Sequence, residues 1–236
     1  MEILVLPDAE SAAARAAFLI AELVQSAIKK RGQCSLAVSG GSTPWLMLAH
    51  LAELKVDWRH VHLFQVDERV LPEGDSNRNW THVIESFVAR VSIPECQVHA
   101  MPVSTSNLEQ AAASYEAVLR AVVGTPVKLD IVHLGLGSDG HTASLVPDDP
   151  ALQAKVSSVV CTNPYQGHRR MTLTFSVLNR ARKLLWLVAG TEKRDALCKL
   201  LNGDRSIPAG RVRGGDATVI ADSAAMGLLD AAMTGP

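Results

Sequence analysis

The chain has 236 residues, of which 47% are hydrophobic and 20% are charged, and its formal net charge at pH 7 is −1. This length and apolar content suit one domain with a substantial core, and we expect residues 1–236 to form a single domain. A nearly neutral chain lacks the broad basic surface that attracts nucleic acid, so we expect no nucleic-acid partner.

The cysteines show no sign of a metal site or of a disulfide framework. There are four of them, far apart in the sequence: Cys34, Cys96, Cys161 and Cys198. They form neither a C-x-x-C motif nor a zinc-binding spacing with histidine. This pattern is typical of reduced thiols in the cytoplasm, so we expect that location and no bound metal.

The N-terminal region lacks a basic segment followed by an apolar run, so no secretory signal is predicted. The apolar stretch 12–28 is interrupted by Arg15 and Glu22. We expect an amphipathic helix here, too short and too charged to cross a membrane.

Short apolar runs alternate with longer segments of helical period along the chain. In chain order, this pattern predicts a strand at 2–6, a helix at 8–31, a strand at 34–39, a helix at 43–54, a strand at 60–67, helices at 79–91 and 107–123, strands at 129–137, 155–162 and 170–175, a short helical turn, a strand at 183–190, a helix at 191–203, a strand at 217–222 and a last short helix. Such alternation predicts a Rossmann-like α/β fold, with a mostly parallel central sheet and helices on both faces. Ligands of these folds bind beyond the carboxyl ends of the strands, so the residues after each strand are the candidates for a site.

The strand at 34–39 is followed by the sequence GGSTP. Its two glycines permit a tight turn, Ser42 or Thr43 can cap the next helix, and Pro44 suits the first helical turn. Backbone N–H groups and hydroxyls at a helix N-terminus bind phosphate, which favours a phosphate site over an ordinary turn. The overlapping AVSGG resembles the elbow of serine hydrolases, but Ser39 precedes a loop better suited to anion binding.

Three charged residues, Asp67, Glu68 and Arg69, stand at the end of the next strand. They cannot all belong to the core. The plain interpretation is a solvated strand end with an ion pair between Asp67 and Arg69, and the spacing alone indicates no chemistry.

The stretch GLGSDGHTASL fits G-x-G-x-x-G, which suggests a dinucleotide site. That fingerprint needs a long helix directly after the glycines and an acidic residue about 20 residues later. Pro147 ends any helix within two turns, and no Asp or Glu lies between Asp149 and Glu192, so we reject this interpretation. What is left is a turn that presents Asp139 and His141, a pair able to act as a base and its support. A surface turn with a capping Asp139 and an idle His141 is the alternative.

Positive charge stands near the ends of two further strands. Arg169 and Arg170 open the strand at 170–175, and Lys193 follows the strand that ends at 190. Together with the GGSTP loop these side chains can form a phosphate clamp, although each alone suits a solvated surface. The other histidines show no metal spacing, and His133 is expected in the core.

Five motifs occur in one order along the chain: SGGSTP, VDER followed by SN, LGLGSDGHTASL, RMTLT and AGTEKRDAL. Together they resemble the 6-phosphogluconolactonase family, which is related to glucosamine-6-phosphate deaminase. The resemblance runs from about residue 3 to about residue 222. The combination of SGGSTP and DGHTASL is specific, whereas either motif alone is weak.

The resemblance implies an α/β fold and hydrolysis of 6-phospho-D-glucono-1,5-lactone to 6-phosphogluconate in the oxidative pentose phosphate pathway, without a metal or an organic cofactor. By motif, it implies that His141 is catalytic and that Asp139 supports it. It assigns the remaining motif residues to the binding of the sugar phosphate: Gly40, Gly41, Ser42, Thr43, Asp67, Arg69, Arg170 and Lys193. It leaves open whether Asp67 acts in the chemistry and which of Arg69, Arg169 and Arg170 contacts phosphate.

On this hypothesis water attacks the lactone carbonyl. His141 takes a proton from the water and returns it to the ring oxygen, while Asp139 holds the imidazole. Backbone N–H groups of the turn at 135–140 are candidates to stabilise the developing oxyanion.

Two departures bear on the alternatives. In the deaminase relatives the DGH turn leads to a glutamate that assists opening of the sugar ring, and Val146 stands at that position, which argues against a deaminase or isomerase. The segment between DER and SN is shorter than expected of lactonases and is expected to shape the mouth of the pocket. A sugar-phosphate sensor of related fold carries a DNA-binding module, whereas this chain begins directly with the α/β pattern. We expect a small phosphosugar lactone as partner, no membrane, and either a monomer or a dimer.

Overall fold

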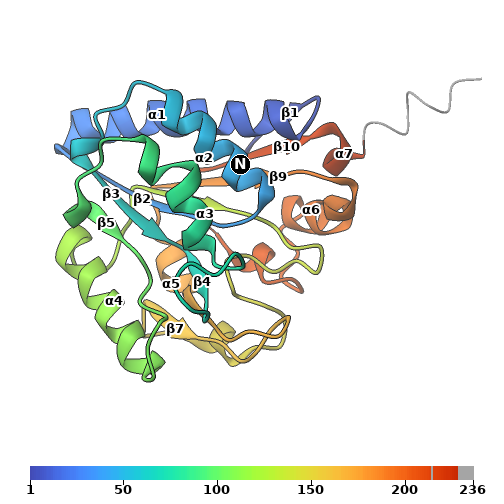
Figure 1. Cartoon of the computed structure of the whole chain (residues 1–236). Coiled ribbons are helices and arrows are strands. Elements are labelled where there is room, and N and C mark those ends of the chain that lie inside the picture. The colour runs from blue at the N-terminus through green and yellow to red at the C-terminus, as the bar shows by residue number, and fades with distance from the viewer. Residues whose placement is uncertain (214, 228–236) are drawn as a thin grey trace, which may run out of the picture.

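The computed structural model describes residues 1–213 and 215–227, in which strands and helices alternate (Figure 1). The strands are β1 Glu2–Leu6, β2 Cys34–Val38, β3 Val61–Gln65, β4 Asp67–Arg69, β5 Val98–His99, β6 Ile131–Leu134, β7 Val159–Cys161, β8 Arg170–Leu173, β9 Lys183–Val188 and β10 Ala217–Asp222. The helices are α1 Ala9–Arg31, α2 Ser42–Glu53, α3 Asn79–Ser86, α4 Leu108–Val123, α5 Phe175–Leu178, α6 Arg194–Leu201 and α7 Ser223–Met226.

Seven strands form the central sheet, in the order β1-β10-β9-β6-β2-β3-β5. Every neighbouring pair in it is parallel. The middle strands β2 and β6 are buried along their whole length, as expected when helices cover both faces. The predicted α/β fold with a mostly parallel sheet is therefore confirmed.

The sheet separates two apolar cores, because successive side chains of a strand point to opposite faces. In β3, Leu63 packs in the core that contains α1 and α2, whereas Phe64 packs in the other core with Tyr115 of α4. In β9, Leu185 likewise packs in the core with α1 and α2, and Trp186 packs in the other core. Each such side chain contributes about 1.5–3 kcal/mol on burial, so the sheet is a firm platform for the loops at its edge.

Helix α1 is capped at both ends as the sequence predicts. The side chain of Asp8 accepts the N–H of Ser11 at 2.7 Å, and Gly32 ends the helix in the left-handed conformation. Among the described residues, α1 is the one helix long and apolar enough to cross a membrane by length and composition, so the expectation that it is too short is wrong. Its alanine-rich face is nevertheless buried, which accounts for its apolar character. The helix packs against α2 and the sheet (Figure 1).

A second sheet departs from the prediction of one sheet. β4, β8 and β7 form a three-stranded antiparallel sheet, in which Asp67 lies opposite Thr172 and Arg69 opposite Arg170. The apolar pattern shows that a segment is extended, but it does not show which strand it pairs with. The DER residues consequently form a strand of their own rather than the solvated end of β3.

Other differences lie at element boundaries. The predicted helix at 79–91 ends at Ser86, because Phe87 leaves the helical conformation and a short 3-10 turn follows at 88–90. The strand predicted at 155–162 is reduced to β7, and the two-residue edge strand β5 is not predicted at all. Both are short edge segments, for which periodicity gives little signal.

Candidate active site

A cavity of about 310 Å³ lies at the carboxyl ends of the neighbouring strands β9, β6, β2 and β3. It contains His141 and every residue that the motifs assign to the sugar phosphate: Gly40, Gly41, Ser42, Thr43, Asp67, Arg69, Arg170 and Lys193. Strand β8 of the second sheet brings Arg170 to it. Segments far apart in the sequence meet at the edge of the sheet where parallel topology places ligand sites.

His141 lines this cavity, and Asp139 lies against its ring. Nδ1 of His141 is 2.6 Å from Oδ1 of Asp139, which also accepts the backbone N–H of His141 at 3.2 Å. The two side chains are 22% and 35% exposed. With Nδ1 engaged by the carboxylate, Nε2 is the ring nitrogen able to exchange a proton with a bound molecule.

The environment keeps Asp139 ionised. Burial alone raises the pKa of this carboxyl, but the hydrogen bonds and charge of His141, with a further bond from Tyr165, hold the pKa well below its usual value. The phenol of Tyr165 donates to Oδ2 at 2.9 Å, so each carboxylate oxygen has a partner. Asp139 therefore acts as a fixed anion behind the imidazole.

The glycines of this turn allow the close packing of the pair. A Cβ atom at Gly137 would lie 2.1 Å from Nδ1 of His141 and 2.5 Å from Oδ1 of Asp139. Any larger residue must therefore displace the pair. No helix follows within residues 141–149, so the long helix that a dinucleotide fingerprint requires directly after its glycines is not formed.

Two of the backbone N–H groups in the turn at 135–140 already have partners inside it. The N–H of Gly137 donates to the carbonyl of His141 at 2.8 Å, and the N–H of Gly140 donates to the carbonyl of Gly137 at 2.9 Å. Both groups are already used within the turn, so neither is available to stabilise an oxyanion.

The GGSTP loop leads into α2, whose first residue is Ser42. The residue before the helix is Gly41, and no side chain caps this end, so the expectation that Ser42 or Thr43 caps the helix is wrong. Both residues lie in the first turn instead, where helical N–H groups have no partner within the helix. The positive end of a 12-residue helix thus borders the cavity.

Arg170 is a buried cation in the cavity wall, with its residue only 4% exposed. Its hydrogen bonds are long, 3.5 Å from Nη1 to Oγ of Ser144 and 3.3 Å from Nη2 to Oε1 of Gln166. Its Nε is buried without a hydrogen-bond partner among the described residues. Burial lowers the pKa of this guanidinium. A guanidinium with so few firm partners suits an anionic ligand.

Asp67 and Arg69 form no ion pair with each other in the described part of the chain, contrary to expectation. Oδ2 of Asp67 accepts the hydroxyl of Ser144 at 2.5 Å. Nη1 of Arg69 donates to the carbonyl of Asn77 at 2.6 Å. This bond ties the SN motif to a residue of the cavity wall.

Of the two remaining cationic side chains, one lines the cavity and the other does not. Lys193 lines it, with Nζ 3.9 Å from the carboxylate of Glu192, a weak contact that leaves the ammonium accessible. Arg169 does not line it and pairs with Glu109 at 2.9 Å. Of the three arginines left open by the sequence, Arg69 and Arg170 are therefore at the site.

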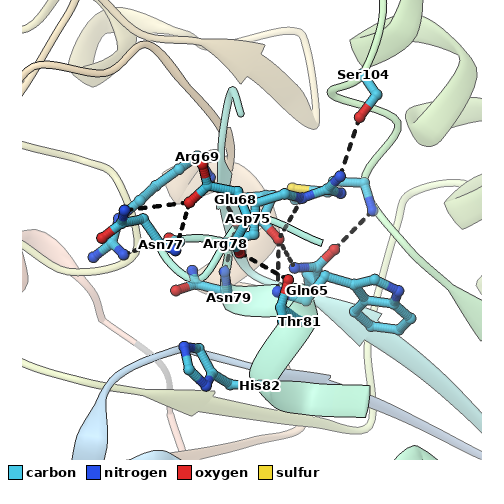
Figure 2. Close-up of polar contacts among 12 residues, drawn as sticks. Gln65, Glu68, Arg69, Asp75, Asn77, Arg78, Asn79, Thr81, His82 and Ser104 are labelled. Carbon is cyan, nitrogen blue, oxygen red and sulfur yellow. Dashed lines mark hydrogen bonds and ion pairs between the residues drawn. The ribbon is translucent and has the colours of Figure 1, made fainter. Parts of the chain in front are cut away.

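Glu68, the middle residue of DER, is fully buried and does not line the cavity. Figure 2 shows its polar contacts. Its carboxylate accepts four hydrogen bonds of 2.8 Å, from the Gln65 side chain and from the backbone N–H groups of Arg69, Asn79 and Trp80. Nε of Arg78 lies 3.7 Å away. This one side chain fixes the start of α3 relative to β4.

Asn79, in the first turn of α3, connects the hydrogen bonds of Glu68 to the cavity wall. Its side chain donates to the carbonyl of Asp67 at 3.2 Å, and a Cβ atom at Gly40 would lie 2.0 Å from its Oδ1. The first turn of α3 therefore packs directly against the glycine loop. Glu68 supports both the loop and the DER strand through this contact.

Several residues at the site are absent from the sequence-based set: Glu68, Asn79, Ser144, Tyr165 and Gln166. Glu68 and Ser144 stand inside the motifs, but polar residues without a spacing rule give no separate signal. Tyr165 and Gln166 lie outside every motif, and only the tertiary structure brings Gln166 to the cavity wall and Tyr165 against Asp139.

His133 is a fully buried residue of β6, as expected. Its Nδ1 accepts the backbone N–H of Ser39 at 3.3 Å, while its Nε2 has no partner among the described residues. Burial lowers the pKa of this imidazole to about 3, so it is neutral. Within residues 1–213 and 215–227, Ser39 thus has a hydrogen bond to a histidine only through its backbone, which gives no support to a serine nucleophile.

Two of the larger cavities lack this chemistry. One of about 500 Å³ contains Arg78, whose guanidinium already contacts Ser104 and Glu68. The other, of about 430 Å³, contains Arg211, which donates to the carbonyl of Leu152. Neither contains a histidine paired with a carboxylate, so size alone does not identify the site. In residues 1–213 and 215–227 no cluster of three or more His, Cys, Asp or Glu side chains is placed to hold a metal ion.

Known proteins resemble this chain in sequence. Over residues 7–221 it matches the family described as Glucosamine-6-phosphate isomerases/6-phosphogluconolactonase. It is 36% identical over 200 residues to a 6-phosphogluconolactonase of Nostoc sp., covering 83% of each chain. It is 34% identical over 210 residues to the 6-phosphogluconolactonase of Mycobacterium tuberculosis, covering 84% of this chain and 85% of the other.

Solved structures resemble it in fold. The 6-phosphogluconolactonase of Thermotoga maritima superposes with a TM-score of 0.84 at 31% identity, over 94% of this chain and 98% of the other. A monomeric glucosamine-6-phosphate deaminase reaches a TM-score of 0.82 at 21% identity, over 97% of this chain and 100% of the other, which shows a shared fold alone.

Proposed function

The chain belongs to the glucosamine-6-phosphate isomerase/6-phosphogluconolactonase family of enzymes, and we propose that it hydrolyses 6-phospho-D-glucono-1,5-lactone to 6-phosphogluconate. The reaction belongs to the oxidative pentose phosphate pathway. One observation carries the proposal: the cavity joins a carboxylate-held histidine to a buried arginine that lacks firm partners. The first group suits proton transfer and the second suits a phosphate.

His141 acts as the general base. Its Nε2 takes a proton from water, whose oxygen attacks the lactone carbonyl carbon, and the same nitrogen returns the proton to the ring oxygen as the carbon–oxygen bond breaks. The ionised Asp139 holds Nδ1 and stabilises the imidazolium that exists between these steps. No metal or organic cofactor takes part in this scheme.

The phosphate is held by positively charged groups that line the same cavity. Arg170, Lys193 and the N-terminus of α2 supply positive charge there, and Arg69 adds a guanidinium whose Nη1 alone has a described partner. Binding energy from this remote group orients the reacting carbon relative to His141.

The proposal also includes the domain organisation, the location and the partner of the protein. Residues 1–236 form one lactonase domain located in the cytoplasm, with a small phosphosugar lactone as its partner. Two observations support the single domain: both cores pack against the same sheet, and the family match spans residues 7–221.

A deaminase or isomerase activity is the second candidate, because the family includes such enzymes and the fold is shared. Val146 is buried, 4% exposed, and offers no carboxylate to assist ring opening after the DGH turn. A non-catalytic sugar-phosphate sensor has no need of the held His141–Asp139 pair.

A coupled assay tests the proposal. Glucose-6-phosphate dehydrogenase generates the lactone, 6-phosphogluconate dehydrogenase consumes the product, and NADPH reports the rate above spontaneous ring opening. His141→Ala is expected to lower kcat by about 10²–10⁴-fold with little change in KM. His60→Ala, at an exposed histidine far from the cavity, is the matched control and is expected to keep full activity.

The outcomes separate the candidates. Acceleration by the wild type that is lost in His141→Ala supports the lactonase and the role of this histidine. Acceleration that persists in His141→Ala contradicts the mechanism. No acceleration at all, with ammonia released from glucosamine 6-phosphate, identifies the deaminase instead.

A further inference from the structure

Tyr165 lies in the loop between β7 and β8, held by a tight turn. Its backbone N–H donates to the carbonyl of His168 at 2.9 Å, and the reverse bond measures 3.3 Å. The two residues between them, Gln166 and Gly167, have φ values of +51° and +85°. Positive φ at both central residues is the pattern of a type I′ turn, which fixes the direction of the flanking side chains.

From this fixed position the side chain of Tyr165 contacts three groups of the site. Its hydroxyl donates to Oδ2 of Asp139 at 2.9 Å. Its ring meets the His141 ring edge to face, with centroids 5.4 Å apart. The guanidinium of Arg170 lies over its face, 5.0 Å from the centroid.

The two oxygens of the Asp139 carboxylate have different hydrogen-bond partners. Oδ1 holds His141 and Oδ2 holds Tyr165, so the carboxylate cannot rotate without losing one of them. The phenol also supports Arg170, whose own hydrogen bonds are long. One aromatic side chain thus contacts both the Asp139–His141 pair and the cation Arg170.

We propose that Tyr165 is a positioning residue with two separable functions: its hydroxyl orients the Asp139–His141 pair, and its ring face holds Arg170 ready for the phosphate of the substrate. The inference rests on the proposed function for its kinetic consequences. The bond between Tyr165 and Asp139 can be tested without any activity.

Two substitutions separate the functions. Tyr165→Phe removes the hydroxyl and keeps the ring, so we expect kcat to fall about 3–10-fold with KM unchanged, as for one hydrogen bond to a charged, partly exposed group. Tyr165→Leu also removes the aromatic face, so we expect KM for the phosphorylated lactone to rise about 3–10-fold in addition. With unphosphorylated glucono-1,5-lactone the extra rise in KM should be absent.

The chain has only two tyrosines, which provides a matched control. Tyr115 is buried in the core and donates to backbone carbonyls away from the cavity. Tyr115→Phe is expected to lower thermal stability while leaving kcat and KM unchanged. Circular dichroism of all three variants checks that each is folded.

An alkaline titration of phenol absorbance provides the readout that is independent of activity. Burial and the bond to Asp139 raise the pKa of Tyr165, and the nearby charge of Asp139 adds to this. In the Tyr115→Phe background the absorbance reports Tyr165 alone. Asp139→Asn in that background should lower the pKa of Tyr165 toward its ordinary value.

The results distinguish the two proposals. Unchanged kcat in Tyr165→Phe, in an enzyme that His141→Ala inactivates, overturns the positioning role. The positioning role is also overturned if Tyr165→Phe and Tyr165→Leu change kcat and KM to the same extent. A general loss of structure would affect both constants in both variants, whereas the proposal expects KM to rise in Tyr165→Leu alone. If the wild type lacks lactonase activity, the proposed function fails, while the titration still decides whether Asp139 holds Tyr165.

Discussion

Two carboxylates close to the same cavity are held in opposite ways. Asp139 is 35% exposed in its side chain and is bound by two side chains, those of His141 and Tyr165. Glu68 is fully buried and is bound mainly by backbone N–H groups of β4 and α3 (Figure 2). The first must adapt as a histidine gains and loses a proton, whereas the second must keep two elements together.

This difference separates activity from stability. Removing the charge of Asp139 disturbs an accessible turn whose loss leaves the core intact. Removing the charge of Glu68 leaves buried donors unpaired and destabilises the fold. Each prediction below concerns a residue that is expected to affect either activity or stability.

Of the two carboxylates, Asp139 is expected to have the larger effect on activity. Asp139→Asn places an amide donor against Nδ1 of His141, so the ring adopts the tautomer whose Nε2 carries the proton and cannot act as a base. We expect kcat to fall about 10²–10³-fold and the midpoint of urea unfolding to change little. Steady-state kinetics and urea denaturation of the same preparation measure both. If the urea midpoint of Asp139→Asn were much lower than that of the wild type, Asp139 would stabilise the fold as Glu68 does, and the difference between the two carboxylates would be contradicted.

The opposite pattern is expected at Glu68. Glu68→Gln keeps the shape of the side chain but leaves Arg78 unpaired and turns a donor toward backbone N–H groups, at a cost of about 3–5 kcal/mol of unfolding free energy. Chemical denaturation measures it. Glu85→Gln, at an exposed glutamate of α3, is the control and should stay within about 0.5 kcal/mol of the wild type. Equal stability of both variants contradicts the structural role of Glu68.

Lys193 tests the proposed binding of the phosphate. Lys193→Ala should raise KM for the phosphorylated lactone about 10–100-fold, the value of a hydrogen bond to a charged group, with a smaller change in kcat. Lys183 stands at the other end of β9, where it pairs with Asp216. Lys183→Ala should leave KM unchanged. If Lys193→Ala loses no preference for the phosphorylated over the unphosphorylated lactone, the phosphate is bound elsewhere.

The smallest effect concerns acid stability. The pKa of His133 is lowered to about 3 in the folded protein, so the unfolded chain binds a proton first as the pH falls below about 6.5. Stability is therefore complete above that pH and declines toward pH 3. Between pH 7 and pH 5 this residue should remove about 2 kcal/mol of unfolding free energy.

His133→Asn provides the comparison, because its side-chain oxygen can accept the N–H of Ser39 in place of Nδ1. Unfolding free energies of both proteins at the two pH values measure the difference. An equally steep decline in the variant shows that other groups cause it.

The sequence by itself determined the alternation of strands and helices, since period and capping residues are local properties. The limits of α1 follow from Asp8 and Gly32, and the carboxyl ends of the strands follow from the apolar runs. Because ligands of parallel sheets bind at those ends, the motif residues could be expected at one site, and the structure brings them into one cavity.

Only the tertiary structure decided the partners of each polar side chain. Asp67 turns to Ser144 rather than to Arg69, Glu68 serves the start of α3, and Arg169 points away from the cavity that Arg170 enters. These choices depend on how the second sheet pairs, and strand pairing joins residues about 100 positions apart without a trace in local periodicity. Tyr165 reaches Asp139 for the same reason: a turn fixes its direction, and the packing of two sheets sets what it meets.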